Sequence, residues 1–148
     1  MYRTWATNDI PTAADFNNLF ADPVTADVTA SESTSSTSYG ALTTAGPAVT
    51  LSLVSGQKCL VWVMFFGSNA IGAGHTAVMS FAVSGASTLA ASDVNAAMND
   101  SSAGSLSVER LTVFTAGASG STTFTSQYKT NGSGSSTFQN RRIIVLTR

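Results

Sequence analysis

The only histidine and three separate acids are the residues of this chain best suited to catalysis. His75 would have to serve any Ser-His-Asp triad, yet no Gly-x-Ser-x-Gly turn for a nucleophile lies upstream of it. Two of the carboxylates of Asp93, Asp100 and Glu109 could in principle act as the acid and base of a glycosidase. No run of aromatic residues surrounds them, however, and their spacing indicates no sugar cleft. The sequence therefore predicts no catalytic residue, and we expect the chain not to be an enzyme.

Metal and cofactor sites are equally weakly indicated. Oxygens from Asp93, Asn95, Asn99 and Asp100 could bind calcium, but such loop groups usually form turns and caps. Cys59 is the single cysteine, so neither an intrachain disulfide nor a CxxC zinc motif can form, and a buried, inert thiol is expected. The two glycines just before His75 lack the third glycine of a dinucleotide-binding loop. We expect no metal and no cofactor.

The composition indicates a folded domain with a neutral surface. The chain has 148 residues, of which 43% are hydrophobic and only 10% charged, and it is rich in Ser and Thr. A domain of this size buries about 70% of the surface that its unfolded chain exposes, which is enough for a core. The net charge of -1 provides no general attraction to nucleic acid or to anionic lipid. We therefore expect neither nucleic acid nor a membrane as a partner.

The few charges are unevenly distributed along the chain. Five of the eight acids precede residue 33, whereas Arg141 and Arg142 lie side by side near the C-terminus. These groups could pair one end of the chain with the other, or with a neighbouring subunit. Solvated surface charges are the favoured interpretation, because exposed ion pairs contribute little.

Residues 1–23 contain the one convincing helix signal. Thr12 can cap the first turn, Asp15 three residues later complements the helix dipole, and Pro23 ends the helix. A helix of about ten residues is marginal alone in water, so its apolar stripe must pack against something. That surface is either the chain's own β-domain or another protein, and docking on another protein is favoured. The expected attachment residues are Trp5, Ile10, Phe16, Leu19 and Phe20.

From residue 24 onward the sequence predicts strands. Runs of alternating or continuous apolar residues are separated by clusters of Gly, Ser and Asn. Residues 58–66 suit a strand that is covered on both faces. The apolar positions of 106–113 change parity, which predicts a bulge or a strand break near Arg110, and Asn131-Gly132 predicts a hairpin. The predicted strands lie at 49–53, 58–66, 77–83, 106–113, 124–128 and 138–147.

These signals predict an all-β fold. We expect a single antiparallel β-sandwich or jelly-roll domain over residues 24–148, preceded by a short N-terminal helix or arm over residues 1–23. Residues 31–38, almost all hydroxyl-bearing, fit either a linker or an edge strand. The large apolar residues outnumber what a thin sandwich needs inside, which predicts an interface between subunits. They are Trp62, Met64, Phe65, Phe66, Phe81, Phe114, Phe124 and Phe138.

The N-terminal stretch from Thr4 to Pro23 resembles an opening common among short virion and tail-associated proteins of tailed bacteriophages. That opening has a tryptophan, then an acid followed by an apolar residue, then Thr-Ala-Ala-Asp-x-Asn and a closing proline. Here Trp5, Asp9-Ile10, 12–17 and Pro23 match it. Segments 79–86, 89–93 and 137–143 are similar to the β-domains that follow it. The resemblance implies an N-terminal attachment segment, an exposed β-domain and commonly a homotrimer, and it implies no catalytic residue.

On this resemblance we expect a virion protein. We expect it to be made in the cytoplasm of the host bacterium, because residues 1–23 contain no apolar core of a secretory signal. The favoured function is capsid decoration or a head fibre that stabilises the particle, with phage capsid or tail proteins as partners. The alternative is a minor tail protein or tail-fibre adhesin that binds the host surface, with a host glycan as a partner. A depolymerase is disfavoured, because the acids are too scattered.

Overall fold

The computed structural model of the chain describes residues 22–69, 75–100 and 104–148. Within them the fold is all-β, and every pair of neighbouring strands is antiparallel. The prediction of an antiparallel all-β fold is confirmed. The strands are β1 (Val24–Val28), β2 (Glu32–Thr34), β3 (Ala48–Leu53), β4 (Lys58–Ser68), β5 (Thr76–Gly85), β6 (Ala97–Asn99), β7 (Leu106–Thr115), β8 (Gly120–Asn131) and β9 (Ser136–Thr147), with one short 3-10 turn, η1 (Asp93–Asn95).

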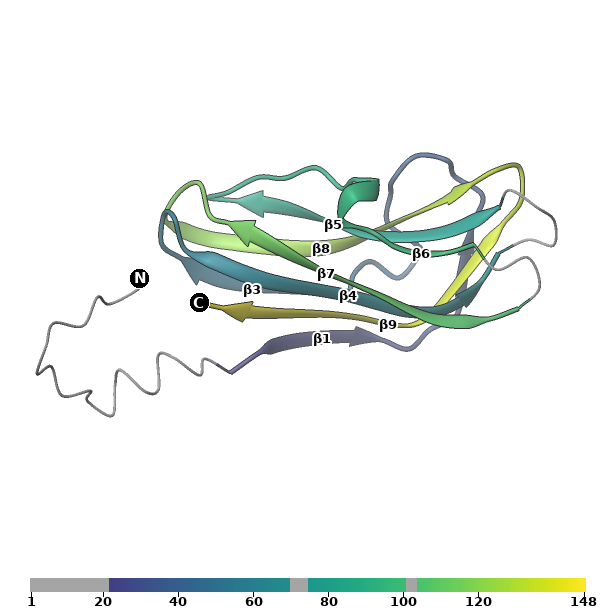
Figure 1. Ribbon diagram of the computed structural model, residues 1–148, viewed down its shortest axis with the longest axis horizontal. Helices are drawn as coiled ribbons and strands as arrows, with labels where there is room; N and C mark the ends of the chain where they lie inside the picture. Colours follow the sequence, from purple (N-terminus) through teal and green to yellow (C-terminus); the bar gives the residue numbers. More distant parts are fainter. Residues whose placement is uncertain (1–21, 70–74, 101–103) are drawn as a thin grey trace, which may run out of the picture.

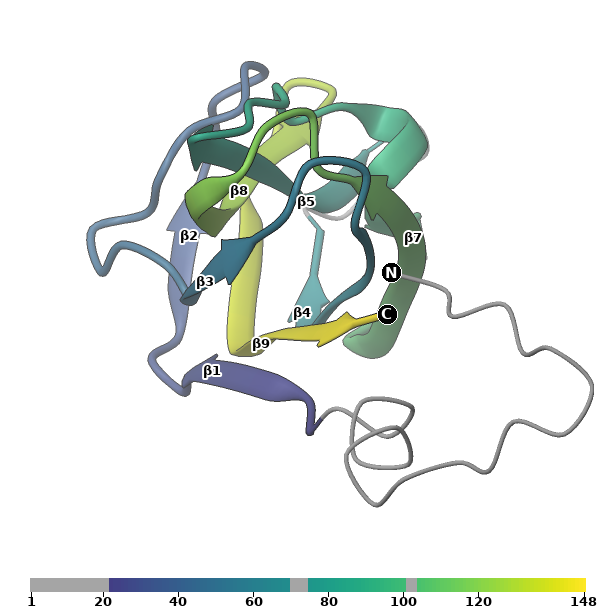
Figure 2. The same cartoon turned by 90° about the vertical axis from the view of Figure 1, so that its left-hand side faces the viewer.

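Two sheets pack face to face in a sandwich-like arrangement (Figure 1). The first sheet has the order β1-β9-β4-β7, and β2 also pairs with β9. The second sheet has the order β3-β8-β5-β6. In Figure 1 the strands run along the long axis of the molecule, and Figure 2 shows them closer to end-on, with β1 below β9. Sequence neighbours β3 and β4 lie in different sheets, as do β4 and β5, so the chain crosses between the layers repeatedly.

The core lies between the sheets and follows the period-2 alternation of strand side chains. Along β4 the side chains alternate between buried and half-buried, and along β8 the same pattern holds. Two aromatic pairs join the layers, Phe114 with Phe124 (ring centroids 5.2 Å apart) and Tyr128 with Phe138 (5.1 Å), and two further pairs lie within one sheet. The largest apolar side chains of the core are Tyr128, Phe65, Phe81, Phe124, Phe138, Met79 and Ile143.

The strand irregularity lies in β9 rather than in β7. Strand β7 pairs with β4 in one unbroken register from Lys58 opposite Thr115 to Gly67 opposite Leu106, so the predicted bulge or strand break near Arg110 is wrong. The apolar residues of β7 lie on both faces of the strand, because some of them point toward the core and others point away from it. In the pairing of β4 with β9 the register shifts by one residue next to Asn140, whose φ of 49° is in the left-handed region. Asparagine tolerates that region better than most residues.

Two local predictions are also corrected. Asn131-Gly132 does not close a hairpin, because β8 pairs with β3 and β5 whereas β9 belongs to the other sheet. The turn carries the chain from one layer to the other. Within residues 31–38, which fitted a linker or an edge strand, Glu32–Thr34 form strand β2 at the edge beside β9.

Arg141 and Glu32 form an ion pair that joins β2 to β9. The side chain of Arg141 is fully buried, and its Nη2 lies 3.2 Å from Glu32 Oε2. Hydrogen bonds from Thr44 and the charge of Arg141 lower the pKa of Glu32, with Thr44 as the largest cause. The guanidinium also lies over the ring of Tyr128, with 5.3 Å between Cζ and the ring centroid. The interpretation as solvated charge is therefore wrong for Arg141: the chain pairs its two ends here.

Cys59 is buried, and desolvation raises the pKa of its thiol to about 11. Since the thiolate is the reactive form, we expect the folded protein to react with a disulfide reagent at pH 8 at least about 100-fold more slowly than the protein unfolded in urea. The measurement is the rate at which the reagent releases its own thiol as it reacts with the protein. The protein with Val54→Cys, whose new thiol lies in an exposed turn, is the control and should gain one fast-reacting group. A fast reaction of the unmodified folded protein would show that Cys59 is accessible.

Candidate interaction surface on the first sheet

The outward face of the first sheet carries a band of large apolar side chains. Strands β9, β4 and β7 lie side by side, and on each of them alternate residues point away from the core. We call this band the apolar face. It consists of Leu60, Trp62, Met64 and Phe66 from β4, Leu111 and Val113 from β7, and Ile144 and Leu146 from β9.

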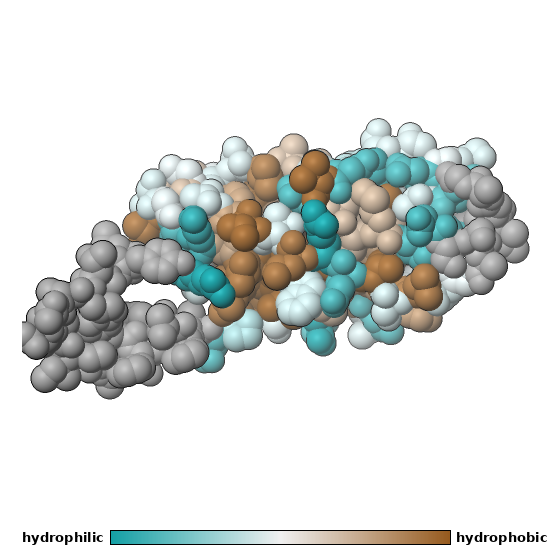
Figure 3. Space-filling view, viewed as in Figure 1, coloured by the Kyte–Doolittle hydropathy of each residue, from teal (hydrophilic) through white to brown (hydrophobic). Residues whose placement is uncertain are grey.

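The exposure of this band is unusual for a soluble domain. Leu111 is 51% exposed and Val113 is 60% exposed, and the other six side chains are half-buried by their neighbours. The Nε1 of Trp62 is covered and has no hydrogen-bond partner among the described residues, so this tryptophan contributes apolar area rather than a polar contact. Figure 3 shows hydrophobic surface gathered where Figure 1 places β4 and β7. The chemistry of such a surface is apolar association, because burying it removes hydrocarbon from water.

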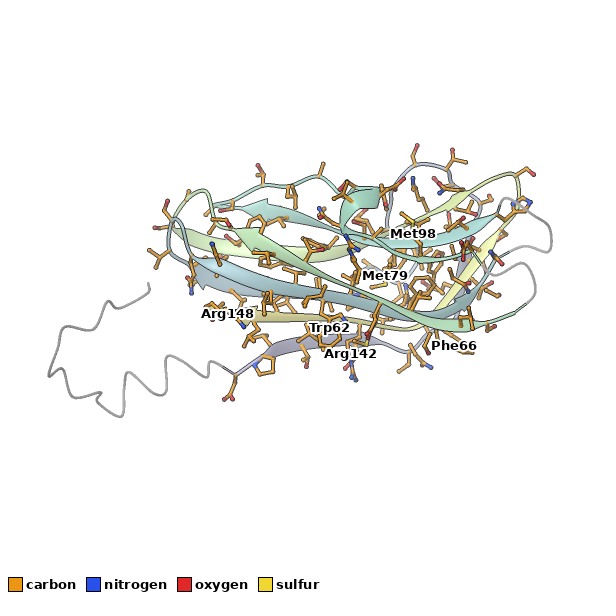
Figure 4. All side chains as sticks on the ribbon, in the orientation of Figure 1. Trp62, Phe66, Met79, Met98, Arg142 and Arg148 are labelled. Atoms are coloured by element: carbon orange, nitrogen blue, oxygen red, sulfur yellow. The ribbon has the colours of Figure 1, made fainter. Side chains whose placement is uncertain are left out.

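Charged side chains border the apolar face at its two ends. Near the β9 bulge, Arg142 forms an ion pair with Asp27 of β1, and the hydrogen bonds that the guanidinium donates to Asp27 raise its pKa. On the other side of Met64 lies the exposed Glu109 of β7. At the opposite end, the backbone N–H of Arg148 donates to the carbonyl of Lys58, which brings two bases together. Figure 4 shows Trp62 between Arg148 on one side and Arg142 and Phe66 on the other.

Two shallow depressions lie beside the bulge and share Met64 and Asn140. One, of about 330 Å³, is also lined by Phe66 and Glu109. The other, of about 380 Å³, is also lined by Arg142 and the β1 residues next to it. Each depression therefore combines an apolar wall with polar groups, which is the composition of small-ligand sites.

The residues that the sequence singled out for chemistry lie apart. Asp93 lies over the second sheet, where it accepts hydrogen bonds from Tyr39 Oη (2.7 Å) and Lys129 Nζ (3.0 Å). These bonds lower the pKa of Asp93, with Lys129 as the largest cause. Glu109 lies on the outward face of the other sheet, so the two carboxylates do not form an acid-base pair.

His75 Nδ1 accepts a hydrogen bond from the backbone of Gly134. No three His, Cys, Asp or Glu residues of the described chain gather into a possible metal site.

The predicted attachment residues Trp5, Ile10, Phe16, Leu19 and Phe20, and the helix that was to carry them, lie outside the described residues. The predicted surplus of large apolar residues is partly wrong. Phe65, Phe81, Phe114, Phe124 and Phe138 fill the core between the sheets. Only Trp62, Met64 and Phe66 are on the outward side, where they form the centre of the apolar face.

Sequence reasoning did not identify the rest of the apolar face. The signal was present in two places. Residues 58–66 are apolar on both faces, which indicated a strand covered on both sides, but within the described residues only the inner side is covered. The change of parity that places Leu111 and Val113 on the face opposite Leu106 and Val108 was interpreted as a bulge or strand break near Arg110 instead of as an apolar outward face. In the sequence Ile144 and Leu146 alternate with Ile143 and Val145, and the structure places the two pairs on opposite faces of β9.

No protein-family model and no curated protein sequence matches this chain. Among the described residues, none lies in a helix with the length and apolar character needed to span a bilayer.

Proposed function

We propose that this chain is a non-enzymatic structural protein of a tailed-phage virion. It decorates the capsid or forms a head fibre on the particle surface, and its N-terminal arm attaches it. In this proposal residues 1–23 are the anchor arm with its short helix, and residues 24–148 are one β-sandwich domain. The protein is made in the cytoplasm of the host bacterium. It functions in the virion as a homotrimer whose other partners are phage capsid or tail proteins.

The observation that carries this proposal is the apolar face. Soluble monomers rarely expose a continuous apolar patch larger than a few hundred Å², and larger patches mark interaction sites. Here eight large apolar side chains share one outward sheet face, with Leu111 and Val113 more than half exposed. A surface of this kind is typical of a protein that functions in an assembly.

The N-terminal resemblance supports the phage particle as the setting. The matching stretch from Thr4 to Pro23 directly precedes β1, which lies at the edge of the sheet that carries the apolar face. The proposed attachment segment is therefore adjacent in the chain to one edge of that sheet. The neutral surface is also consistent with many copies held close together, because like charges at high density repel one another.

Stabilisation of the particle would follow from mass action. A protein that binds the assembled shell and not its separated subunits lowers the free energy of the shell, as any ligand of a native state does. A small contribution from each copy, repeated over many copies, resists heat and the pressure of packaged DNA. This is the physical meaning of decoration in the proposal.

The test uses the phage that encodes this chain and a derivative that lacks its gene. Purified particles should contain the protein, and its absence from them would overturn the proposal. Particles of the derivative should adsorb to host cells normally but release DNA at lower temperature or lower salt than wild-type particles. Supplying the protein from a plasmid should restore the release temperature.

The two depressions beside the β9 bulge favour one alternative, a tail adhesin that binds a host glycan. Phe66 offers an apolar platform, and Glu109, Asn140 and Asp27 offer polar groups of the kind that bind sugar hydroxyls. The same deletion separates the two functions. Unchanged thermal release of DNA together with a large loss of adsorption would establish the adhesin and exclude decoration.

A further inference from the structure

The side chains of the apolar face lie in rows across the first sheet. Each row takes one residue from β9, one from β4 and one from β7. The three strands stay in one register along β4 from Cys59 to Met64, before the bulge. Two adjacent rows are entirely apolar, and the next is charged at both ends. In order along β4, the rows are Leu146-Leu60-Val113, Ile144-Trp62-Leu111 and Arg142-Met64-Glu109.

The charged row is complementary to itself, whereas Lys58 at the opposite end of β4 would meet Lys58 of the other copy, so the charge complementarity is confined to this row. Arg142, paired with Asp27, lies on one margin, and Glu109 lies on the other margin of the same row. Glu109 forms no ion pair with any residue in the described part of the chain. If two copies meet face to face with their strands parallel, each row meets the same row of the other copy. The Glu109 margin of one copy then faces the Arg142 margin of its neighbour.

The size of the face fits a small specific interface. The three strands of the rows, about 4.8 Å apart and about ten residues long at about 3.3 Å per residue, cover roughly 480 Å², and the shorter β1 adds roughly 80 Å² before the relief of the side chains is counted. Standard interfaces bury about 800 Å² on each partner, and the smallest specific ones about 600 Å². The two apolar rows would form the dry centre, and the charged row would form part of the rim, as in interfaces generally.

We infer that the apolar face binds the apolar face of a second copy of this chain, with parallel strands and with Glu109 of one copy facing the Arg142–Asp27 pair of its neighbour. The inference rests on the proposed function for its setting, an oligomeric virion protein. Its evidence is the arrangement of the rows and charges. Trp62, at the centre of the middle row, becomes the most deeply buried residue of the interface.

The first test is the mass of the purified full-length protein by light scattering over a wide range of concentration. One chain has a mass of 15.2 kDa, and we expect a dimer of twice that mass. Val113→Lys places an unpaired charge opposite the apolar Leu146 of the other copy and should raise the dissociation constant by about 100-fold, because burying a charge without a partner is costly. Val54→Lys is the matched control, since Val54 is 61% exposed in a turn outside the face and Val113 is 60% exposed. It should leave the mass unchanged.

The second test exchanges the charges of the rim between two proteins. Glu109→Lys puts a lysine opposite the neighbour's Arg142, and Arg142→Glu puts two glutamates opposite each other. Each variant alone should therefore associate less tightly than the wild type. In an equal mixture every contact between unlike copies joins opposite charges, so mixed oligomers should form in preference to either pure species. A mixture that stays unassociated would show that the margins do not meet.

The remaining outcomes decide against the inference. The unmodified protein would stay at the mass of one chain if residues 1–21 of the same chain covered the face, or if a different virion protein did. Either result would overturn self-association, and neither would change the deletion experiment on the particle. Conversely, an oligomer disrupted by Val113→Lys would support the inference even if the protein were absent from virions. Because a face that binds the same face closes with two copies, a dimer would support the inference and correct the proposed number of subunits, whereas a closed trimer would overturn it.

Discussion

Phe138→Ala is expected to lower the free energy of unfolding by about 3–5 kcal/mol, the usual cost of deleting a buried aromatic ring from a core. Phe138 is fully buried on β9 next to the bulge. Its ring centroid lies 5.0 Å from that of Phe65 and 5.1 Å from that of Tyr128, so the substitution removes two aromatic contacts as well as buried area. The measurement is urea denaturation followed by far-ultraviolet circular dichroism.

Phe66→Ala is the matched control, because Phe66 is also on the first sheet but points outward and is half-buried. It should cost about 1 kcal/mol or less at low protein concentration, where self-association contributes least. A similar loss of stability in both variants would contradict the assignment of one phenylalanine to the core and the other to the apolar face.

The strands could be predicted because alternation is a local property of the sequence. Ala77, Met79, Phe81 and Val83 share one face in the sequence pattern, and all four are buried in the core. The alternation pattern does not indicate which strands pair with one another. Asn131-Gly132 shows this, since the turn signal was correct but the chain leaves its sheet there. Pairing between strands far apart in sequence depends on how they pack together, and a short stretch of sequence carries no information about these distant contacts.

The difference between Arg141 and Arg142 shows why the charged part of the site could not be predicted. The two residues are chemically identical neighbours, and either could have been the exposed one. The register shift beside Asn140 turns Arg141 toward the core and Arg142 toward the apolar face. One residue more or less in β9 would exchange their roles, because a one-residue slip moves every side chain to the other face. The apolar face could have been found in part, from residues 58–66 and the parity of Leu111 and Val113.

The double substitution Phe16→Ala and Phe20→Ala is expected to weaken attachment of the protein to the particle by about 3–6 kcal/mol. Each fully buried large apolar side chain contributes about 1.5–3 kcal/mol, and the sequence places both rings on the same side of the predicted helix as Leu19. The thermal unfolding of the β-domain should remain cooperative with an unchanged midpoint, because the attachment residues are proposed to contact a partner. The measurement is binding of the purified variant to particles that lack the protein, with unfolding followed in parallel.

Asn18→Ala is the control within the same segment, since Asn18 lies between the apolar positions and is expected to face water. It should bind like the unmodified protein. The alternative left open by the sequence makes the opposite prediction: if the stripe packs on the chain's own β-domain, the double variant loses stability and its melting midpoint falls. In that case residues 1–23 belong to the domain, and attachment has to be sought on another surface. Loss of binding without loss of stability is the only combination that identifies the segment as an anchor.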